Sequence, residues 1–164
     1  MSPLMPRPPD RSAGQAESEL LADLQAVYRD ADQLHAGWSC PASTECCRFG
    51  VTGREPYVTS IELAAVKKAA AARGGMRSWK KAPPLGPSLP VLDDERRCPF
   101  LDASGRCAVY ATRPLGCRTF YCERAEAGGK VKQREVNALV RRIQDIAARH
   151  QPDGDKGRPL TRAL

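Results

Sequence analysis

The chain has 164 residues, a formal net charge of +7 and only 5% aromatic residues. Roughly a third of its hydrophobic residues are alanine, which favours helices but buries little apolar area. There is no apolar segment of membrane-spanning length and no signal-peptide-like run at the start, so we expect a cytoplasmic protein that does not span a membrane.

Two terminal segments, residues 1–16 and 151–164, are rich in proline and polar residues. We expect both to be flexible tails. Residues 17–150 are then expected to form a single domain. Its thin apolar core needs a further source of stability, because a small domain buries a small share of its surface.

A first helix is predicted over residues 17–35. Apolar residues recur on one face at helical spacing: Leu20, Leu24, Val27, Tyr28, Ala31 and Leu34. Gly37 provides a stop signal. A loop then carries the first cysteine cluster, which consists of Cys40, Cys46 and Cys47.

A second helix is predicted over residues 59–73. Thr59 followed by Glu62 matches a capping box at its start, and two glycines follow its end. Residues 76–90 hold four prolines and one glycine. They are predicted to form a connector that is long for a compact domain.

The second cysteine cluster lies in residues 91–122 and consists of Cys98, Cys107, Cys117 and Cys122. Residues 102–105 predict a turn between two short extended pieces that carry Cys98 and Cys107. A short helical turn is expected from Leu115, after the extended residue that precedes Pro114.

A third helix is predicted over residues 131–150. Its apolar face consists of Val136, Leu139, Val140, Ile143, Ile146 and Ala147. The predicted fold class is therefore mainly α with a small α+β character, in which about three helices pack around a cysteine-rich centre of loops and a hairpin.

The seven cysteines avoid all three predicted helices and gather in two loop-rich segments. In a cytoplasmic protein, clustered cysteines favour metal binding or redox chemistry over disulfides, and the odd count argues against a closed disulfide framework. A single buried cysteine often serves as a small apolar residue, but this interpretation does not suit seven that cluster. Thiolate sulfur is a soft ligand that suits zinc, cuprous copper and iron–sulfur clusters.

The spacing of the cysteines resembles known metal sites. Cys117 and Cys122 approach the spacing of a zinc knuckle, and Cys98 and Cys107 suit the two arms of a hairpin. Cys40 could form another knuckle with Cys46 or Cys47. The two histidines, His35 and His150, lie on or beside helix faces and are interpreted as surface or packing residues.

A longer motif joins these cysteines. The stretch from Cys98-Pro-Phe through Cys107-Ala-Val-Tyr110 and Arg113-Pro114 to Cys117-Arg118-Thr-Phe120 resembles the YkgJ-type cysteine-cluster family, the CxxCxxCC zinc- or iron-chelating domain. The resemblance covers about residues 38–122. It implies a small metal-chelating domain, and some members are labelled iron–sulfur proteins or accompany flagellin lysine methylases.

The family's opening motif falls on Cys40, Ser43, Cys46 and Cys47, so its second cysteine is replaced by Ser43. A serine hydroxyl is a poor ligand because it stays protonated near neutral pH. We hypothesise that Cys122 fills the vacant coordination place. Adjacent side chains diverge along a chain, so Cys46 and Cys47 are not expected to face one metal in the same way. Either one is a ligand and the other packs nearby, or the two serve different ions.

Charged and aromatic residues flank the cysteines. Arg113 and Arg118 could donate to thiolates, but a structural role is favoured for both, and Arg48 is interpreted as solvated. The aromatic neighbours are predicted to form a dry shell around the sulfurs: Phe49, Phe100, Tyr110 and Phe120. The third helix mixes arginine with acidic residues, which argues against a nucleic-acid partner.

The sequence therefore predicts a small cytoplasmic protein that chelates zinc or iron through Cys40, Cys46, Cys47, Cys98, Cys107, Cys117 and Cys122. The alternative is a redox protein or oxidoreductase that uses thiols or an iron–sulfur cluster. No conventional catalytic motif is recognised, and the protein partner is unknown. We also expect that removing the metal sharply lowers helical content.

Overall fold

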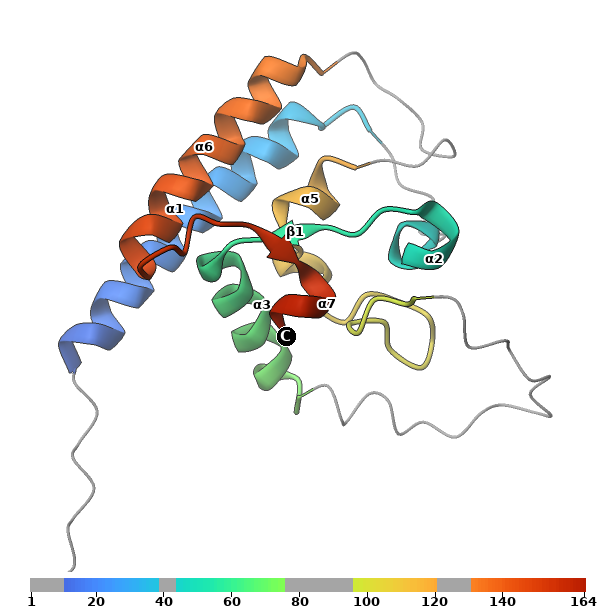
Figure 1. Cartoon of the computed structure of the whole chain (residues 1–164), viewed down its shortest axis with the longest axis horizontal. Coiled ribbons are helices and arrows are strands. Elements are labelled where there is room, and N and C mark those ends of the chain that lie inside the picture. Colours follow the sequence, from blue (N-terminus) through green and yellow to red (C-terminus); the bar gives the residue numbers. More distant parts are fainter. Residues whose placement is uncertain (1–10, 39–43, 76–95, 121–130) are drawn as a thin grey trace, which may run out of the picture.

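The computed structural model describes residues 11–38, 44–75, 96–120 and 131–164. Over these residues the protein is mainly helical and contains one two-stranded sheet (Figure 1). This confirms the predicted fold class. The predicted connector at residues 76–90, Ser43, Cys40 and Cys122 lie outside the described residues.

Three long helices correspond to the three predicted ones. They are α1 (Arg11–Leu34), α3 (Ser60–Ala72) and α6 (Gln133–His150). The predicted capping pair is present at the start of α3, where Thr59 N donates to Glu62 Oε2 at 2.9 Å. Helix α1 begins inside the expected N-terminal tail, because no proline follows Pro9 to interrupt the helix.

The three long helices share an apolar core, with α1 and α6 lying side by side (Figure 1). Most of the predicted apolar faces of α1 and α6 are buried there, although Val140 is 38% exposed. Periodicity alone predicted these faces. The buried members of the whole core, which also include residues outside α1 and α6, are Leu24, Val27, Tyr28, Ala31, Ile61, Ala65, Leu115, Leu139, Ile143, Ile146 and Ala147.

A second apolar core lies on the other side of α3. Helix α3 contributes Ile61 and Ala65 to the helical core but Val66 and Ala70 to the second core, so it is apolar on two faces. The members of the second core are Phe49, Val58, Val66, Ala70, Cys98, Phe100, Val109 and Leu160. Helix α3 therefore separates the purely helical core from the core that contains cysteine.

Short elements carry the chain around the second core. They are the 3₁₀ turns η1 (Glu45–Cys47) and η2 (Tyr110–Thr112), the short helices α2 (Phe49–Thr52), α5 (Leu115–Arg118) and α7 (Leu160–Ala163), and the strands β1 (Tyr57–Val58) and β2 (Arg158–Pro159). Helix α5 confirms the predicted helical turn from Leu115.

The expectation of a flexible tail at residues 151–164 is wrong. Strand β2 pairs antiparallel with β1, with Tyr57 opposite Pro159 and Val58 opposite Arg158. Leu160 N donates to Pro56 O at 3.0 Å, and the Leu160 side chain is 1% exposed. A polar, proline-containing segment is thus fixed by backbone pairing and one buried leucine, and neither feature shows in the local composition.

The turn that leads back to β1 depends on Gly154. Ser60 N donates to Gly154 O at 3.0 Å. A Cβ atom at residue 154 would collide with the carbonyl oxygen of Ala147 and the hydroxyl of Ser60. Only glycine allows this close approach between the end of α6 and the start of α3.

No helix within the described part of the chain is both long enough and apolar enough to cross a membrane.

Candidate metal centre

Two segments that are distant in sequence meet at the first cysteine cluster. Cys98 N donates to Cys47 O at 2.7 Å, and Phe49 N donates to Arg96 O at 2.6 Å. These bonds surround an antiparallel bridge between Arg48 and Arg97. Backbone pairing therefore brings Cys47 next to Cys98 and joins the two clusters that the sequence separates.

The hairpin predicted around residues 102–105 is present. Leu101 and Cys107 form an antiparallel bridge, and Ala108 N donates to Phe100 O at 2.8 Å. Asp102 closes the turn, because its Oδ1 accepts hydrogen bonds from Ser104 N at 2.9 Å and Arg106 N at 3.0 Å. The hairpin places Cys98 and Cys107 on its two arms, as predicted.

Cys117 is carried by α5, and a buried carboxylate fixes this helix. Leu115 N donates to Glu62 Oε1 at 2.9 Å, while Tyr28 OH donates to the same oxygen at 3.4 Å. Glu62 is 3% exposed. Burial raises the pKa of Glu62 above its ordinary value of 4.5, although the hydrogen bonds that it accepts act in the opposite direction. Through Glu62, helix α3 sets the position of the residue that begins α5.

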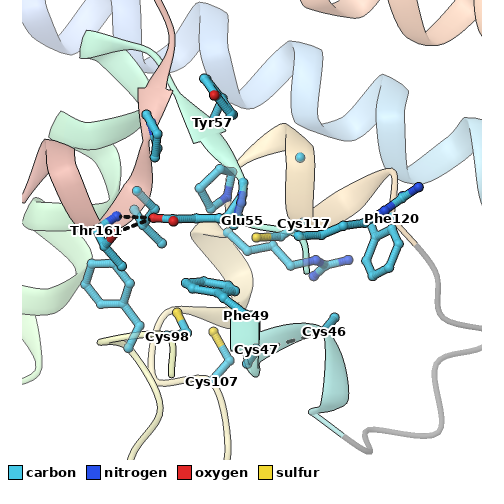
Figure 2. Close-up of a pocket in the computed structure, with 18 of the residues that line it drawn as sticks. Cys46, Cys47, Phe49, Glu55, Tyr57, Cys98, Cys107, Cys117, Phe120 and Thr161 are labelled. Atoms are coloured by element: carbon cyan, nitrogen blue, oxygen red, sulfur yellow. Dashed lines mark hydrogen bonds between the residues drawn. The ribbon is translucent and has the colours of Figure 1, made fainter. Parts of the chain in front are cut away.

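Five cysteines from these elements line one cavity of about 1200 Å³: Cys46, Cys47, Cys98, Cys107 and Cys117 (Figure 2). We call it the cysteine cavity. Cys98 is buried, and the other four are partly buried. The structure thus brings together every predicted ligand among the residues that it describes.

The adjacent pair Cys46 and Cys47 is closer than expected. The two Sγ atoms are 4.0 Å apart because η1 is a tight 3₁₀ turn, entered through Thr44 in the left-handed conformation with φ 55°. Two sulfurs bound to one tetrahedral zinc at about 2.3 Å are separated by roughly 3.8 Å. The two side chains therefore do not diverge; their separation suits both a shared metal and the expected arrangement in which one is a ligand and the other bonds nearby, so which of them is a ligand stays a prediction.

Crowding and burial raise the pKa values of four of the cavity thiols when no metal is bound. The hydrogen bond to Cys47 and then burial raise the pKa of Cys46 far above its ordinary value. For Cys47 the bond from Cys46 lowers the pKa, but the bond to Cys98, burial and neighbouring thiols together raise it to about 12. Burial also raises the pKa of Cys107 and Cys117. A cation in the cavity would be needed to make them thiolates near neutral pH.

Within the described residues, no three Cys, His, Asp or Glu side chains are arranged to hold a metal ion. The donor set nevertheless fits zinc or iron, because five soft sulfurs face one cavity and lie close enough to perturb one another's pKa.

Arg118 has a structural role. Its guanidinium is 3% exposed and donates to both carboxylate oxygens of Asp32, at 2.8 and 2.6 Å, and to Ala111 O at 2.5 Å. It also stacks over the ring of Tyr28 at 4.2 Å. Arg118 thereby ties α5 to α1.

Arg113 faces the thiols instead. It lies over the Tyr110 ring at 4.1 Å and 3.8 Å from Asp32. Its positive charge lowers the pKa of Cys46 and of Cys107, in both cases against larger effects that raise it. Arg113 therefore favours the thiolate form of two cavity cysteines.

The predicted dry shell is present in part. Phe49 and Phe100 line the cavity with 1% and 2% of their surface exposed. The prediction is wrong for Tyr110, which is 55% exposed. The two histidines contact other groups: His35 Nδ1 lies 3.0 Å from Ala31 O, and His150 Nδ1 lies 2.9 Å from Ser60 Oγ.

Several residues that build the site were not identified from sequence. Asp32 and Glu62 lie on predicted helices, where an acidic residue is normally solvated. Glu55 lines the cavity and accepts hydrogen bonds from Thr161 N at 2.6 Å and Thr161 Oγ1 at 2.5 Å (Figure 2). The only sequence signal was at Glu62, through the capping box.

Clustered cysteines on loops around one cavity are typical of the class of small metal-chelating domains. Its residues 39–139 match the CxxCxxCC family, described as a "putative zinc- or iron-chelating domain". The protein belongs to this family. No curated protein and no solved structure matches the chain at a significant level.

Proposed function

We propose that this is a cytoplasmic metal-binding protein that chelates zinc or iron through thiolates. The proposed ligands are drawn from Cys40, Cys46, Cys47, Cys98, Cys107, Cys117 and Cys122. One observation carries the proposal: backbone pairing between Cys47 and Cys98 brings two distant clusters together, and five thiols line one cavity. A bound ion would join the two segments and add to the stability of the fold.

Metal chelation accounts for the thiols better than thiol–disulfide exchange does. The attacking species in exchange is the thiolate, and redox-active cysteines usually have lowered pKa values. The pKa values of Cys46, Cys47, Cys107 and Cys117 are raised. Buried, protonated thiols are poor nucleophiles, whereas a metal ion displaces their protons.

An iron–sulfur cluster, which would make the protein a redox protein, is the second candidate. It is favoured by the number of sulfurs, since a tetrahedral zinc site uses four ligands and five cysteines line the cavity. A protein partner would then receive or supply electrons. A nucleic-acid partner is not proposed, because α6 carries Glu135 and Asp145 among its arginines.

The deciding experiment is anaerobic purification of the full chain, followed by visible absorption and elemental analysis of the same sample. Zinc would give a colourless protein with a stoichiometric zinc content. An iron–sulfur cluster would give a brown protein that bleaches on reduction, together with iron and acid-labile sulfide. A colourless protein without zinc or iron would contradict the proposal.

The role of Cys122 is tested by replacement. We propose that Cys122 supplies the ligand that Ser43 cannot, so Cys122→Ser should lower metal content or affinity. Ser43→Cys in the same background should restore it, because it recreates the family's opening motif. Unchanged stoichiometry and affinity in Cys122→Ser would contradict this assignment.

A further inference from the structure

The charge of the cysteine cavity is not explained by metal binding. Its described lining includes five arginines and a single carboxylate: Arg54, Arg96, Arg106, Arg113, Arg162 and Glu55. Glu55 is already engaged, because its Oε1 accepts two hydrogen bonds from Thr161. The described side chains that line the cavity therefore carry a net positive charge.

Four of these arginines have no acidic partner within residues 11–38, 44–75, 96–120 and 131–164, which the structure describes. Among the described residues, no carboxylate lies within ion-pair distance of Arg54, Arg96, Arg106 or Arg162, and Arg113 lies 3.8 Å from Asp32. Two arginines away from the cavity are paired: Arg142 with Asp30 at 2.6 Å, and Arg149 with Asp23 at 2.9 Å. Within the part of the chain that the structure describes, four arginines without an acidic partner therefore lie around this one cavity.

A metal centre would neutralise only part of this charge. The lining arginines outnumber the carboxylate by four. A zinc ion held by four thiolates adds roughly two negative charges. About two positive charges then remain unbalanced beside the site.

The walls of the cavity provide an apolar surface next to the arginines. Phe49, Phe100 and Leu160 form the buried base of this surface, whereas the rings of Tyr57 and Tyr110, 64% and 55% exposed, and the partly buried Phe120 line it where a ligand can reach them. The Cζ atom of Arg54 lies over the Phe120 ring at 4.8 Å from its centroid, a cation–π contact that holds the guanidinium beside the cavity. An apolar wall with a few oriented charged donors is typical of a small-molecule site, and the volume of about 1200 Å³ is large enough for one.

We propose that the cysteine cavity binds a small organic anion. Its carboxylate or phosphate group would contact the lining arginines, and its apolar body would lie against the accessible rings of Tyr57, Tyr110 and Phe120. This function goes beyond metal chelation: it provides a binding site for a substrate or effector next to the metal centre.

The test uses a fluorescent aromatic anion, anilinonaphthalene sulfonate, and its uncharged analogue N-phenylnaphthylamine. Both are titrated into the purified full chain. We expect saturable, one-to-one binding of the anion. The triple variant Arg54→Gln/Arg96→Gln/Arg106→Gln should bind the anion at least about tenfold more weakly, since each charged hydrogen bond contributes substantially. Binding of the uncharged analogue should not change.

A matched control separates contact from general electrostatics. Arg134→Gln removes one charge from α6, which does not line the cavity, and should change anion binding less than about twofold, because exposed charges are screened. Equal anion binding by the triple variant and the wild type would overturn the proposal. So would loss of metal in the triple variant, because the arginines would then serve the metal centre. Metal content is measured on the same samples. A failure of the anion proposal can therefore be distinguished from a failure of the chelation proposal.

Discussion

Arg118 illustrates how one side chain connects the site to the rest of the fold. Its planar guanidinium makes two bonds to Asp32 on α1, further bonds to the carbonyl oxygens of Ala111 and Arg113, and a stacking contact with Tyr28. A lysine ammonium cannot satisfy this set because it lacks the fork geometry. The residue that follows Cys117 is therefore fixed by the helical core.

We expect Arg118→Lys to lower the free energy of unfolding by about 2–3 kcal/mol, because the buried guanidinium loses several charge-assisted hydrogen bonds that an ammonium cannot replace. Urea denaturation monitored by circular dichroism measures this. The matched control is Arg142→Lys, whose pair with Asp30 is about half exposed on both sides. That change should cost less than about 1 kcal/mol. Equal effects of the two substitutions would contradict the assigned role.

At the scale of residues, sequence identified the cysteines but not the groups that position them. Cys98 and Cys107 were predicted on two arms of a hairpin, because the turn chemistry of residues 102–105 is local. Asp32 could not be identified, since its partner Arg118 is far away in sequence. The approach of Cys46 to Cys47 depends on a 3₁₀ turn, which adjacent residues alone do not specify.

At the scale of elements, the segment containing β2 and α7 covers one side of the cysteine cavity. Pro159, Leu160, Thr161 and Arg162 line the cavity, and Leu160 belongs to the second core together with Cys98. The three long helices were predictable because their apolar residues follow one local period. This segment was not, because its order comes from pairing with β1, about a hundred residues away.

We expect Leu160→Ala to destabilise the protein by about 2–5 kcal/mol, because it removes a fully buried side chain from the second core. Leu164→Ala serves as the control, since Leu164 is 39% exposed and should contribute less than about 1 kcal/mol. Urea midpoints of the two variants check this. A flexible segment, as the composition suggests, would make both substitutions silent.

At the scale of the whole molecule, two cores share α3, and only the second one contains cysteine. This changes the expectation that metal removal sharply lowers helical content. The helical core buries residues of α1, α3 and α6 without any sulfur. Loss of the metal should therefore loosen the second core first.

We expect a chelator under reducing conditions to leave most of the far-ultraviolet circular dichroism signal intact. Near-ultraviolet signals from the aromatic residues around the cavity should decrease, because Phe49 and Phe100 lose their fixed environment. The urea midpoint should also fall, since the bound metal stabilises only the folded state. A parallel collapse of both spectral regions would show instead that the helical core depends on the metal.

The pH dependence of metal binding follows from the raised thiol pKa values. Protons compete with the metal for each thiol, so affinity should rise with pH. The metal-free protein has the opposite dependence: a raised pKa stabilises the folded state at low pH, and this stability is lost as pH rises above the ordinary thiol value of 9.0.

With the pKa of Cys47 at about 12, its thiol is still protonated at pH 9 and should release nearly a full proton on metal binding. An unperturbed thiol would already be half ionised there. Zinc titration calorimetry in buffers of different ionisation enthalpy counts the protons. Cys47→Ser should release about one proton fewer, and a proton count at pH 9 of half that at pH 7 would contradict the raised values.

Leu160 and Thr161, which cover one side of the cysteine cavity, are synthesised after all of the described cysteines. At roughly 5–20 residues per second, the ribosome needs about 2–9 s to extend the chain from Cys117 to Leu160. During this interval the described cysteines have been synthesised while the cavity still lacks one of its sides. We expect the nascent chain to capture its metal most readily then, before strand pairing encloses the thiols.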